Sequence, residues 1–218
     1  MKRLVISGSV LALIVTTTFV GAVHGAEKSP WIELFDGTSL NGWHISQTNG
    51  HGNTTGWTVV DGSIDGTQDK KGNGGILLTD REFGDFVLEL ELNPDWGLDS
   101  GLFLRSTESG QCYQMMVDYY EGGNVGGIYG EGIGGFHFPA STYDKHYKKG
   151  EWNKVVIVCT GNPPAIDVWL NGEHITSYQG DSPDLLPAKG RIALQVHAGD
   201  GFFGKHTRFR NIRIRPLD

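Results

Sequence analysis

The sequence predicts an all-β fold, a two-sheet antiparallel β-sandwich or jelly roll. Many short segments alternate apolar and polar residues, which is the pattern of a strand with one buried face. Turn residues separate these segments at short intervals, and 33 of the 218 residues are glycine. The glycines follow no fixed period, so they indicate frequent tight turns rather than a collagen-like repeat.

The first 26 residues are predicted to be a secretory signal segment. Lys2 and Arg3 form a basic start, an apolar run extends from Leu4 to Val20, and small residues follow as far as Ala26. A retained membrane anchor is the alternative, but the serines, threonines and small-residue end of the run favour cleavage. We expect a secreted or periplasmic protein without stable membrane insertion, whose residues 27–218 form a single domain.

Net charge and cysteine content narrow the classes of partner and site. The formal charge is -7 for the full chain and becomes -9 once the two basic residues of the signal segment are removed. This balance disfavours nucleic acid as a partner. Cys112 and Cys159 both lie inside apolar runs, so two buried thiols are favoured over a disulfide. Without a Cys-x-x-Cys pattern, a cysteine-based zinc site is not expected.

The strand predictions rest on period-two alternation and on the turns between segments. The clearest case is DFVLELELN at 85–93, where the residues at 86, 88, 90 and 92 are apolar and their neighbours are mostly acidic. Asp61-Gly62 and Asn171-Gly172 predict hairpin turns. The strands are expected, in chain order, at 32–35, 56–60, 75–79, 85–93, 101–105, 112–120, 152–159, 165–170, 191–197 and 208–215.

Two other segments are expected between the strands. Residues 122–135 are so rich in glycine that they are predicted to form a loop. This loop contains no Gly-Lys-Ser/Thr and opens no expected helix, so it is not a phosphate-binding loop. The only helix expected is short, around 141–149.

Polar side chains on three expected strands should share one face of a sheet. Because side chains alternate along a strand, residues at even spacing project together. Such a face, rich in hydrogen-bonding groups and beside aromatic residues, suits a polyhydroxylated ligand, although solvated outer faces would show the same alternation. The candidates are Arg105, Gln114, Asp118, Gln195 and His197 on the strands, with Tyr129, Glu131 and His137 from the glycine-rich segment.

Glu89 and Glu91 offer a different candidate, an ordinary two-carboxylate glycosidase. They stand at i and i+2 on one strand face, about 7 Å apart by strand geometry, which lies in the range that inverting glycosidases use. However, Glu-x-Glu on an amphipathic strand is usually solvated surface, and we favour that interpretation.

Several segments in succession resemble the 3-keto-disaccharide hydrolase domain family. The resemblance extends from Glu33 to Leu217 and implies a concanavalin A-like β-sandwich. Many relatives carry Tyr-Glu-x-Gln where this chain has Tyr113-Gln114-Met115-Met116. Gln114 thus replaces the glutamate of those relatives, and the nearest acid on the strand is Asp118. The matching segments are LFDGTSLNGW, WTVVDGSI, DFVLELEL, DSGLFLR, GGIYG, EWNKVVIV, VWLNGE, IALQVH and FRNIRIRPL.

The resemblance implies an exported enzyme that cleaves 3-keto-glycosides, including 3-keto-disaccharides. A ketone at C3 acidifies the hydrogen on C2, so that a base can remove it and the group at C1 can leave before water adds. An upstream sugar oxidoreductase would have to supply the keto-sugar. The alternative function is a non-catalytic, lectin-like carbohydrate-binding module, since the same fold serves both.

The implied chemistry distributes roles among the candidate residues. Asp118 or Glu131 would be the base and His197 or His137 the acid, whereas Arg105 and Gln114 would orient the sugar and stabilise negative charge. Tyr129 and Gln195 complete the expected binding surface. No cofactor is required by the sequence. A divalent cation held by Asp118, Glu131 and His197 remains open, but no ligand spacing demands one.

Overall fold

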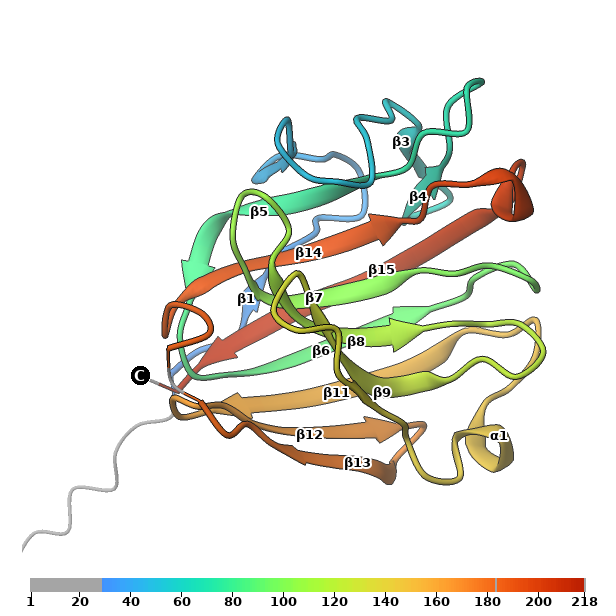
Figure 1. The fold of residues 1–218 in the computed structure, drawn as a ribbon. Coiled ribbons are helices and arrows are strands. Elements are labelled where there is room, and N and C mark those ends of the chain that lie inside the picture. Colours follow the sequence, from blue (N-terminus) through green and yellow to red (C-terminus); the bar gives the residue numbers. More distant parts are fainter. Residues whose placement is uncertain (1–28, 183, 218) are drawn as a thin grey trace, which may run out of the picture.

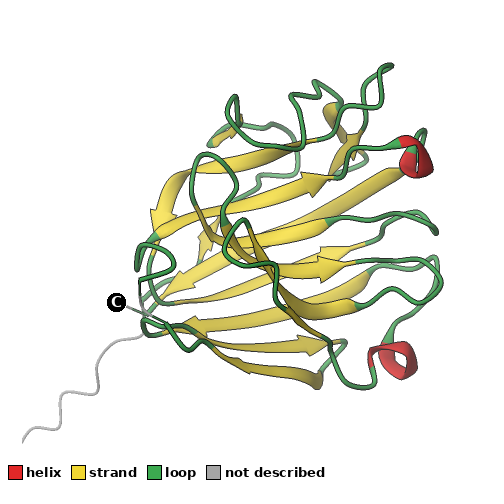
Figure 2. Ribbon diagram, viewed as in Figure 1, coloured by secondary structure: helices red, strands yellow, loops and turns green. Residues whose placement is uncertain are grey.

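The computed structural model describes residues 29–182 and 184–217, so the predicted signal segment lies outside the described part. Within the described residues the chain forms two antiparallel sheets packed face to face (Figure 1). Helix is confined to the short α1 (Tyr143–His146) and the 3-10 turn η1 (Asp200–Phe202), as Figure 2 shows. The prediction of an all-β sandwich is confirmed. None of the described helices is long and apolar enough to cross a bilayer.

The first sheet, sheet A, is built around the longest strand, β15 (His206–Pro216), which pairs with β6 on one side and β4 on the other. The two-residue strand β1 (Ile32–Glu33) also pairs with β15. In order across the sheet the strands are β13 (Glu173–Gln179), β12 (Ala165–Leu170), β11 (Asn153–Thr160), β6 (Phe86–Leu92), β15, β4 (Ser63–Thr67) and β3 (Trp57–Val60).

The second sheet, sheet B, carries the residues that the sequence singles out. Its middle consists of β8, β7 and β14, so strands far apart in the sequence lie side by side (Figure 1). The order is β10 (His137–Phe138), β9 (Val125–Glu131), β8 (Cys112–Val117), β7 (Gly101–Ser106), β14 (Gly190–Val196), β5 (Gly75–Phe83) and β2 (Trp43–Ile45).

The core lies between the sheets and is supplied by the alternation seen in the sequence. Strand β6 alternates fully buried and partly exposed residues along its whole length, with Phe86, Leu88, Leu90 and Leu92 facing inwards. On β8 the residues Tyr113, Met115 and Val117 face the same core, which leaves Gln114 and Met116 on the outer face of sheet B.

The outer face of sheet B has a small apolar cluster of its own. Its members, all fully buried, are Ile76, Leu78, Phe103, Cys112 and Ala193. Cys112 therefore belongs to this cluster, whereas Cys159 belongs to the core between the sheets. Both cysteines are free and buried, in agreement with the expectation of buried thiols.

The hairpin turns are confirmed. Strands β3 and β4 pair across Asp61-Gly62, and β12 and β13 pair across Asn171-Gly172. In both turns the two central residues have positive φ, which Asn, Asp and Gly tolerate best.

The prediction of a loop over 122–135 is wrong in its central part. Strand β9 occupies Val125–Glu131 and pairs with β8. A Cβ on Gly130 would lie 2.4 Å from the ring of Phe136, and one on Gly127 would lie 2.4 Å from the methyl group of Met116. The glycines thus make room for neighbouring side chains against strand β9, although the segment has the glycine-rich composition of a loop.

Candidate functional site

A cavity of about 440 Å³ opens on the outer face of sheet B. Titratable and amide side chains make up most of its lining, and none of the lining residues is lysine or arginine. It brings together seven of the eight site residues predicted from the sequence. The lining residues are His51, Asp99, Gln114, Met116, Asp118, Tyr129, Glu131, His137, Gln195 and His197.

Period-two alternation accounts for most of this convergence. Gln114 and Met116 stand on β8, and Asp118 follows at the end of the same strand. Gln195 lies on β14, and His197 follows directly after that strand. Because β7 separates β8 from β14, the face spans three adjacent strands.

Strands β9 and β10 form the other wall of the cavity. Tyr129 pairs in register with Gln114 across β9 and β8, and Glu131 pairs with Cys112. His137 on β10 lies opposite Tyr129 and is exposed, so it occupies the rim rather than the interior.

His51 is a site residue that the sequence analysis missed. It lies on the loop between β2 and β3, and its ring packs edge-on against Phe103 at 6.2 Å. Two hydrogen bonds hold this loop in place. The Ser46 hydroxyl donates to the Glu108 carbonyl at 2.7 Å, and the His51 backbone N–H donates to the Asn49 side chain at 2.9 Å. A loop residue has no strand periodicity, so no pattern in the sequence pointed to His51.

Asp99 is the second missed residue. It lies just before β7, in the segment DSGLFLR, and lines the cavity together with Asp118. The bridge between Leu98 and Tyr119 joins the two segments that carry these acids. The sequence signal was an acid next to a strand start, which is too common to be distinctive.

A chain of amides crosses the floor of the cavity. Gln114 Nε2 donates to the Ser100 carbonyl and to Gln195 Oε1, both at 3.4 Å, and Gln195 Nε2 lies 3.2 Å from His51 Nε2. Gly101 makes room for Gln114, because a Cβ there would lie 2.4 Å from Gln114 Nε2. These contacts hold two amide groups towards the space where a ligand would lie.

The two inner histidines lie close together, with ring centroids 5.4 Å apart. His197 Nδ1 donates to the Ala198 carbonyl at 2.6 Å, which leaves Nε2 available to a bound molecule. His51 Nε2 lies 3.6 Å from Glu131 Oε1. The cavity therefore contains an imidazole of defined tautomer and a second imidazole beside a carboxylate.

Asp118 and Asp99 are set up to hold protons. Burial, together with the nearby Asp99 carboxylate, raises the pKa of Asp118 to about 7. Burial also raises the pKa of Asp99, with Glu131 adding to the effect and His197 and His51 opposing it. Carboxyl groups whose pKa approaches neutrality are typical of general acid–base sites.

Comparison with known proteins shows the family of the chain. The family model described as "3-keto-alpha-glucoside-1,2-lyase-like domain" matches residues 30–215, nearly the whole described chain. The chain belongs to this family. A curated relative from Bacteroides thetaiotaomicron, named 3-keto-disaccharide hydrolase, is 34% identical and aligns over 86% of this chain and 79% of its own length. Membership confirms the resemblance and the expectation of an enzyme that acts on glycosidic bonds.

Solved structures share the fold. A crystal structure titled as a glycosyl hydrolase, from Parabacteroides distasonis, is 28% identical with a TM-score of 0.63, covering 86% of this chain and all of that one. The carbohydrate-binding module CBM66 of Bacillus subtilis, at 15% identity, has a TM-score of 0.55 over 80% of this chain and 95% of its own. A lichenase from a mouse hindgut metagenome, at 14% identity, has a TM-score of 0.59 over 88% of this chain and all of its own. The last two show the concanavalin A-like fold alone.

Arg105 is the one predicted site residue that lies outside the cavity. Its position on β7 has φ +52, and the pairing of β7 with β14 shifts by one residue at this point. The resulting bulge breaks the alternation that predicted a side chain on the outer face. Arg105 is instead 2% exposed and donates to the carbonyls of Gly84 and Gly161 and to Asp85, so its predicted role in binding sugar is wrong.

Glu89 and Glu91 project from the outer face of sheet A and take no part in the cavity. Glu89 pairs with Arg213 at 2.7 Å and Lys154 at 3.3 Å, and Glu91 accepts from Arg210 at 2.6 Å. These ion pairs support the interpretation of the two glutamates as surface residues. A glycosidase mechanism based on Glu89 and Glu91 would therefore lack free carboxylates.

Among the described residues, no group of three His, Cys, Asp or Glu side chains is arranged to hold a metal ion. Asp118, Glu131 and His197 all line the cavity, but their arrangement does not support the cation that the sequence analysis left open.

Proposed function

We propose that this protein is an exported enzyme that cleaves 3-keto-glycosides, including 3-keto-disaccharides, by elimination at C2 followed by addition of water. The observation that carries the proposal is the pairing of Asp118, whose pKa is about 7, with His197, whose Nε2 is free, in one cavity. The name of the Bacteroides relative supports the same substrate class.

In the first half of the proposed reaction, the Asp118 carboxylate removes the proton from C2 and an enolate forms at C3. A carboxylate with a raised pKa is a stronger base than an ordinary one and is still substantially ionised at neutral pH. The enolate then expels the oxygen at C1, a C1–C2 double bond forms, and the C3 ketone is restored. Protonated His197 donates its Nε2 proton to the departing oxygen.

The second half restores the starting protonation state of both residues. Neutral His197 removes a proton from water as the oxygen of that water bonds to C1, and Asp118, whose carboxyl proton exchanges with solvent between the two halves, protonates C2. The sum of the two halves is hydrolysis. Gln195, which keeps one Nε2–H after its contact with His51, is suited to donate to the enolate oxygen, the role first assigned to Arg105 and Gln114.

Export and supply complete the proposal. Residues 1–26 would direct the chain to the periplasm or the exterior and be removed there, which leaves residues 27–218 without a stable membrane attachment. Since the substrate carries a ketone in place of a hydroxyl, a sugar oxidoreductase must act before this enzyme.

The test is turnover by purified residues 27–218 of an aryl 3-keto-glucoside and of its unoxidised parent. Release of the aglycone from the keto form alone is the expected result. Equal cleavage of both compounds would contradict the proposal. Binding without turnover of either compound would also contradict it and would identify a lectin-like carbohydrate-binding module instead.

A further inference from the structure

A second hollowed region lies away from the cavity, where the outer face of sheet A meets one edge of the sandwich. It consists of two adjoining hollows of about 320 and about 310 Å³, which share Asn93 and Arg208 in their linings. Trp152 lines the first hollow and Trp96 lines the second. We call this region the tryptophan groove.

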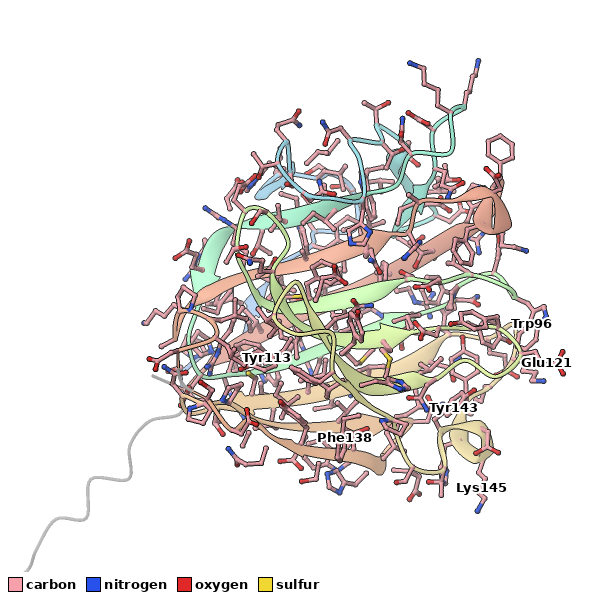
Figure 3. All side chains as sticks on the ribbon, in the orientation of Figure 1. Trp96, Tyr113, Glu121, Phe138, Tyr143 and Lys145 are labelled. Atoms are coloured by element: carbon pink, nitrogen blue, oxygen red, sulfur yellow. The ribbon has the colours of Figure 1, made fainter. Side chains whose placement is uncertain are left out.

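Both tryptophans are held in place by neighbouring side chains. Trp96 is 52% exposed, and its ring meets Tyr119 edge-on at 4.9 Å. Figure 3 shows Trp96 at the outer edge of the molecule. The Arg210 guanidinium lies over the Trp152 ring at 4.1 Å. Large, supported aromatic rings at a surface hollow are typical of binding sites, because they offer apolar contact area at little cost in side-chain entropy.

The charges in the tryptophan groove neutralise one another. Arg208 pairs with Asp65 at 3.1 Å and with Asp95 at 2.8 Å, and Arg210 pairs with Glu91 at 2.6 Å. An anionic ligand would have to compete with these carboxylates for the two guanidinium groups. A neutral ligand can accept from and donate to the paired groups without separating them.

One polar side chain in the groove is still free to bind. The Asn93 amide lies in both hollows and has no hydrogen-bond partner among the described residues. Fixed polar groups beside aromatic rings match the hydroxyl edges and C–H faces of a sugar chain better than they match a peptide or a lipid.

We propose that the tryptophan groove binds a neutral oligosaccharide chain as an auxiliary site, separate from the catalytic cavity. Its occupant need not carry a keto group, because the groove holds no acid–base pair aimed at a sugar ring. The groove would keep the enzyme on a glycan while the cavity acts on single oxidised glycosides. The binding of a neutral oligosaccharide in the groove does not depend on the proposed function.

The test uses ¹⁵N-labelled residues 27–218 titrated with maltohexaose, cellohexaose and laminarihexaose. The indole N–H signals of Trp96 and Trp152 should move with at least one of these probes. Trp96→Ala and Trp152→Ala should each weaken binding about tenfold or more, as expected for a stacking tryptophan at a binding site.

Two controls separate the groove from the rest of the molecule. Trp169→Ala should leave binding unchanged, because Trp169 packs against His174 on strands outside the groove. The Asp118→Asn variant should also bind the oligosaccharide probe normally, because Asp118 lies in the cavity and not in the tryptophan groove. The inference is overturned if no probe moves the two signals, or if binding survives loss of either groove tryptophan. Binding that disappears in the Asp118 variant would overturn it as well, by placing the sugar in the cavity.

Discussion

At the scale of single residues, the cavity depends on how its surroundings change ordinary side chains. Asp118 has no hydrogen-bond donor among the described residues, and burial and the neighbouring Asp99 favour its protonated form. The Ala198 carbonyl fixes which nitrogen of His197 is free. These surroundings favour Asp118 as the base and His197 as the acid, a choice that the sequence alone could not make.

Asp118→Asn removes the proposed base while keeping the size of the side chain. We expect turnover of a 3-keto-glucoside to fall by about 10²–10⁴-fold, the usual contribution of a general base. Steady-state kinetics on the folded variant measures the loss. Glu121→Gln, at an exposed carboxylate that Figure 3 shows at the edge of the molecule, is the control and should keep full activity. Equal activity of the Asp118 variant would exclude Asp118 as the base.

The pH dependence of kcat/KM should reflect the raised pKa of Asp118. Since the base must be ionised, activity should rise with pH through about 7, rather than through the ordinary carboxyl range near 4. Asp99→Asn removes a negative charge that raises this pKa, so the rising limb should move to lower pH. A limb that stays in place in the Asp99 variant would show that the two acids do not interact.

At the scale of elements, a single bulge in β7 decides which residues reach the cavity. Strict alternation would direct Arg105 to the same face as Gly101 and Phe103. The left-handed backbone conformation at Arg105 instead turns its side chain towards Asp85 and the carbonyls of Gly84 and Gly161. Sequence periodicity correctly grouped Gln114 with Asp118 and Gln195 with His197, because β8 and β14 are regular around these residues. It could not detect the bulge, which depends on pairing with β14.

Arg105→Ala should therefore reduce stability rather than substrate affinity. The buried guanidinium satisfies two backbone carbonyls, and leaving such groups unpaired costs on the order of 3 kcal/mol in the free energy of unfolding. Urea denaturation measures this cost, with the exposed Arg81→Ala as the matched control. A stable Arg105 variant with a raised KM would restore the binding role that the structure argues against.

Gly101→Ala tests the amide chain from a neighbouring strand. The new methyl group would collide with Gln114, which must then leave its contact with Gln195. We expect a higher KM or lower kcat, with the fold retained, because the backbone of Gly101 does not have positive φ. Gly50→Ala, where a methyl group meets nothing within 4 Å, is the control. Unchanged kinetics in the Gly101 variant would mean that the position of Gln114 does not matter.

At the scale of the whole molecule, the two sheets serve different purposes. The outer face of sheet B carries the titratable cavity, whereas the outer face of sheet A carries paired charges and part of the tryptophan groove. Composition and alternation were sufficient to predict the sandwich, since both sheets follow the same period. They were insufficient for His51 and Asp99, because a loop folded onto a sheet and a residue before a strand are located only by tertiary packing.

The most direct test of the proposed mechanism is the fate of the C2 hydrogen during cleavage in D₂O. Elimination followed by addition of water predicts that the 3-keto-sugar released by residues 27–218 carries one deuterium at C2. Early time points and the free product incubated alone correct for uncatalysed exchange. Mass spectrometry of the product reads the result. Cleavage with the original hydrogen retained at C2 would contradict the account, because the C2 proton would then never have exchanged with solvent through Asp118.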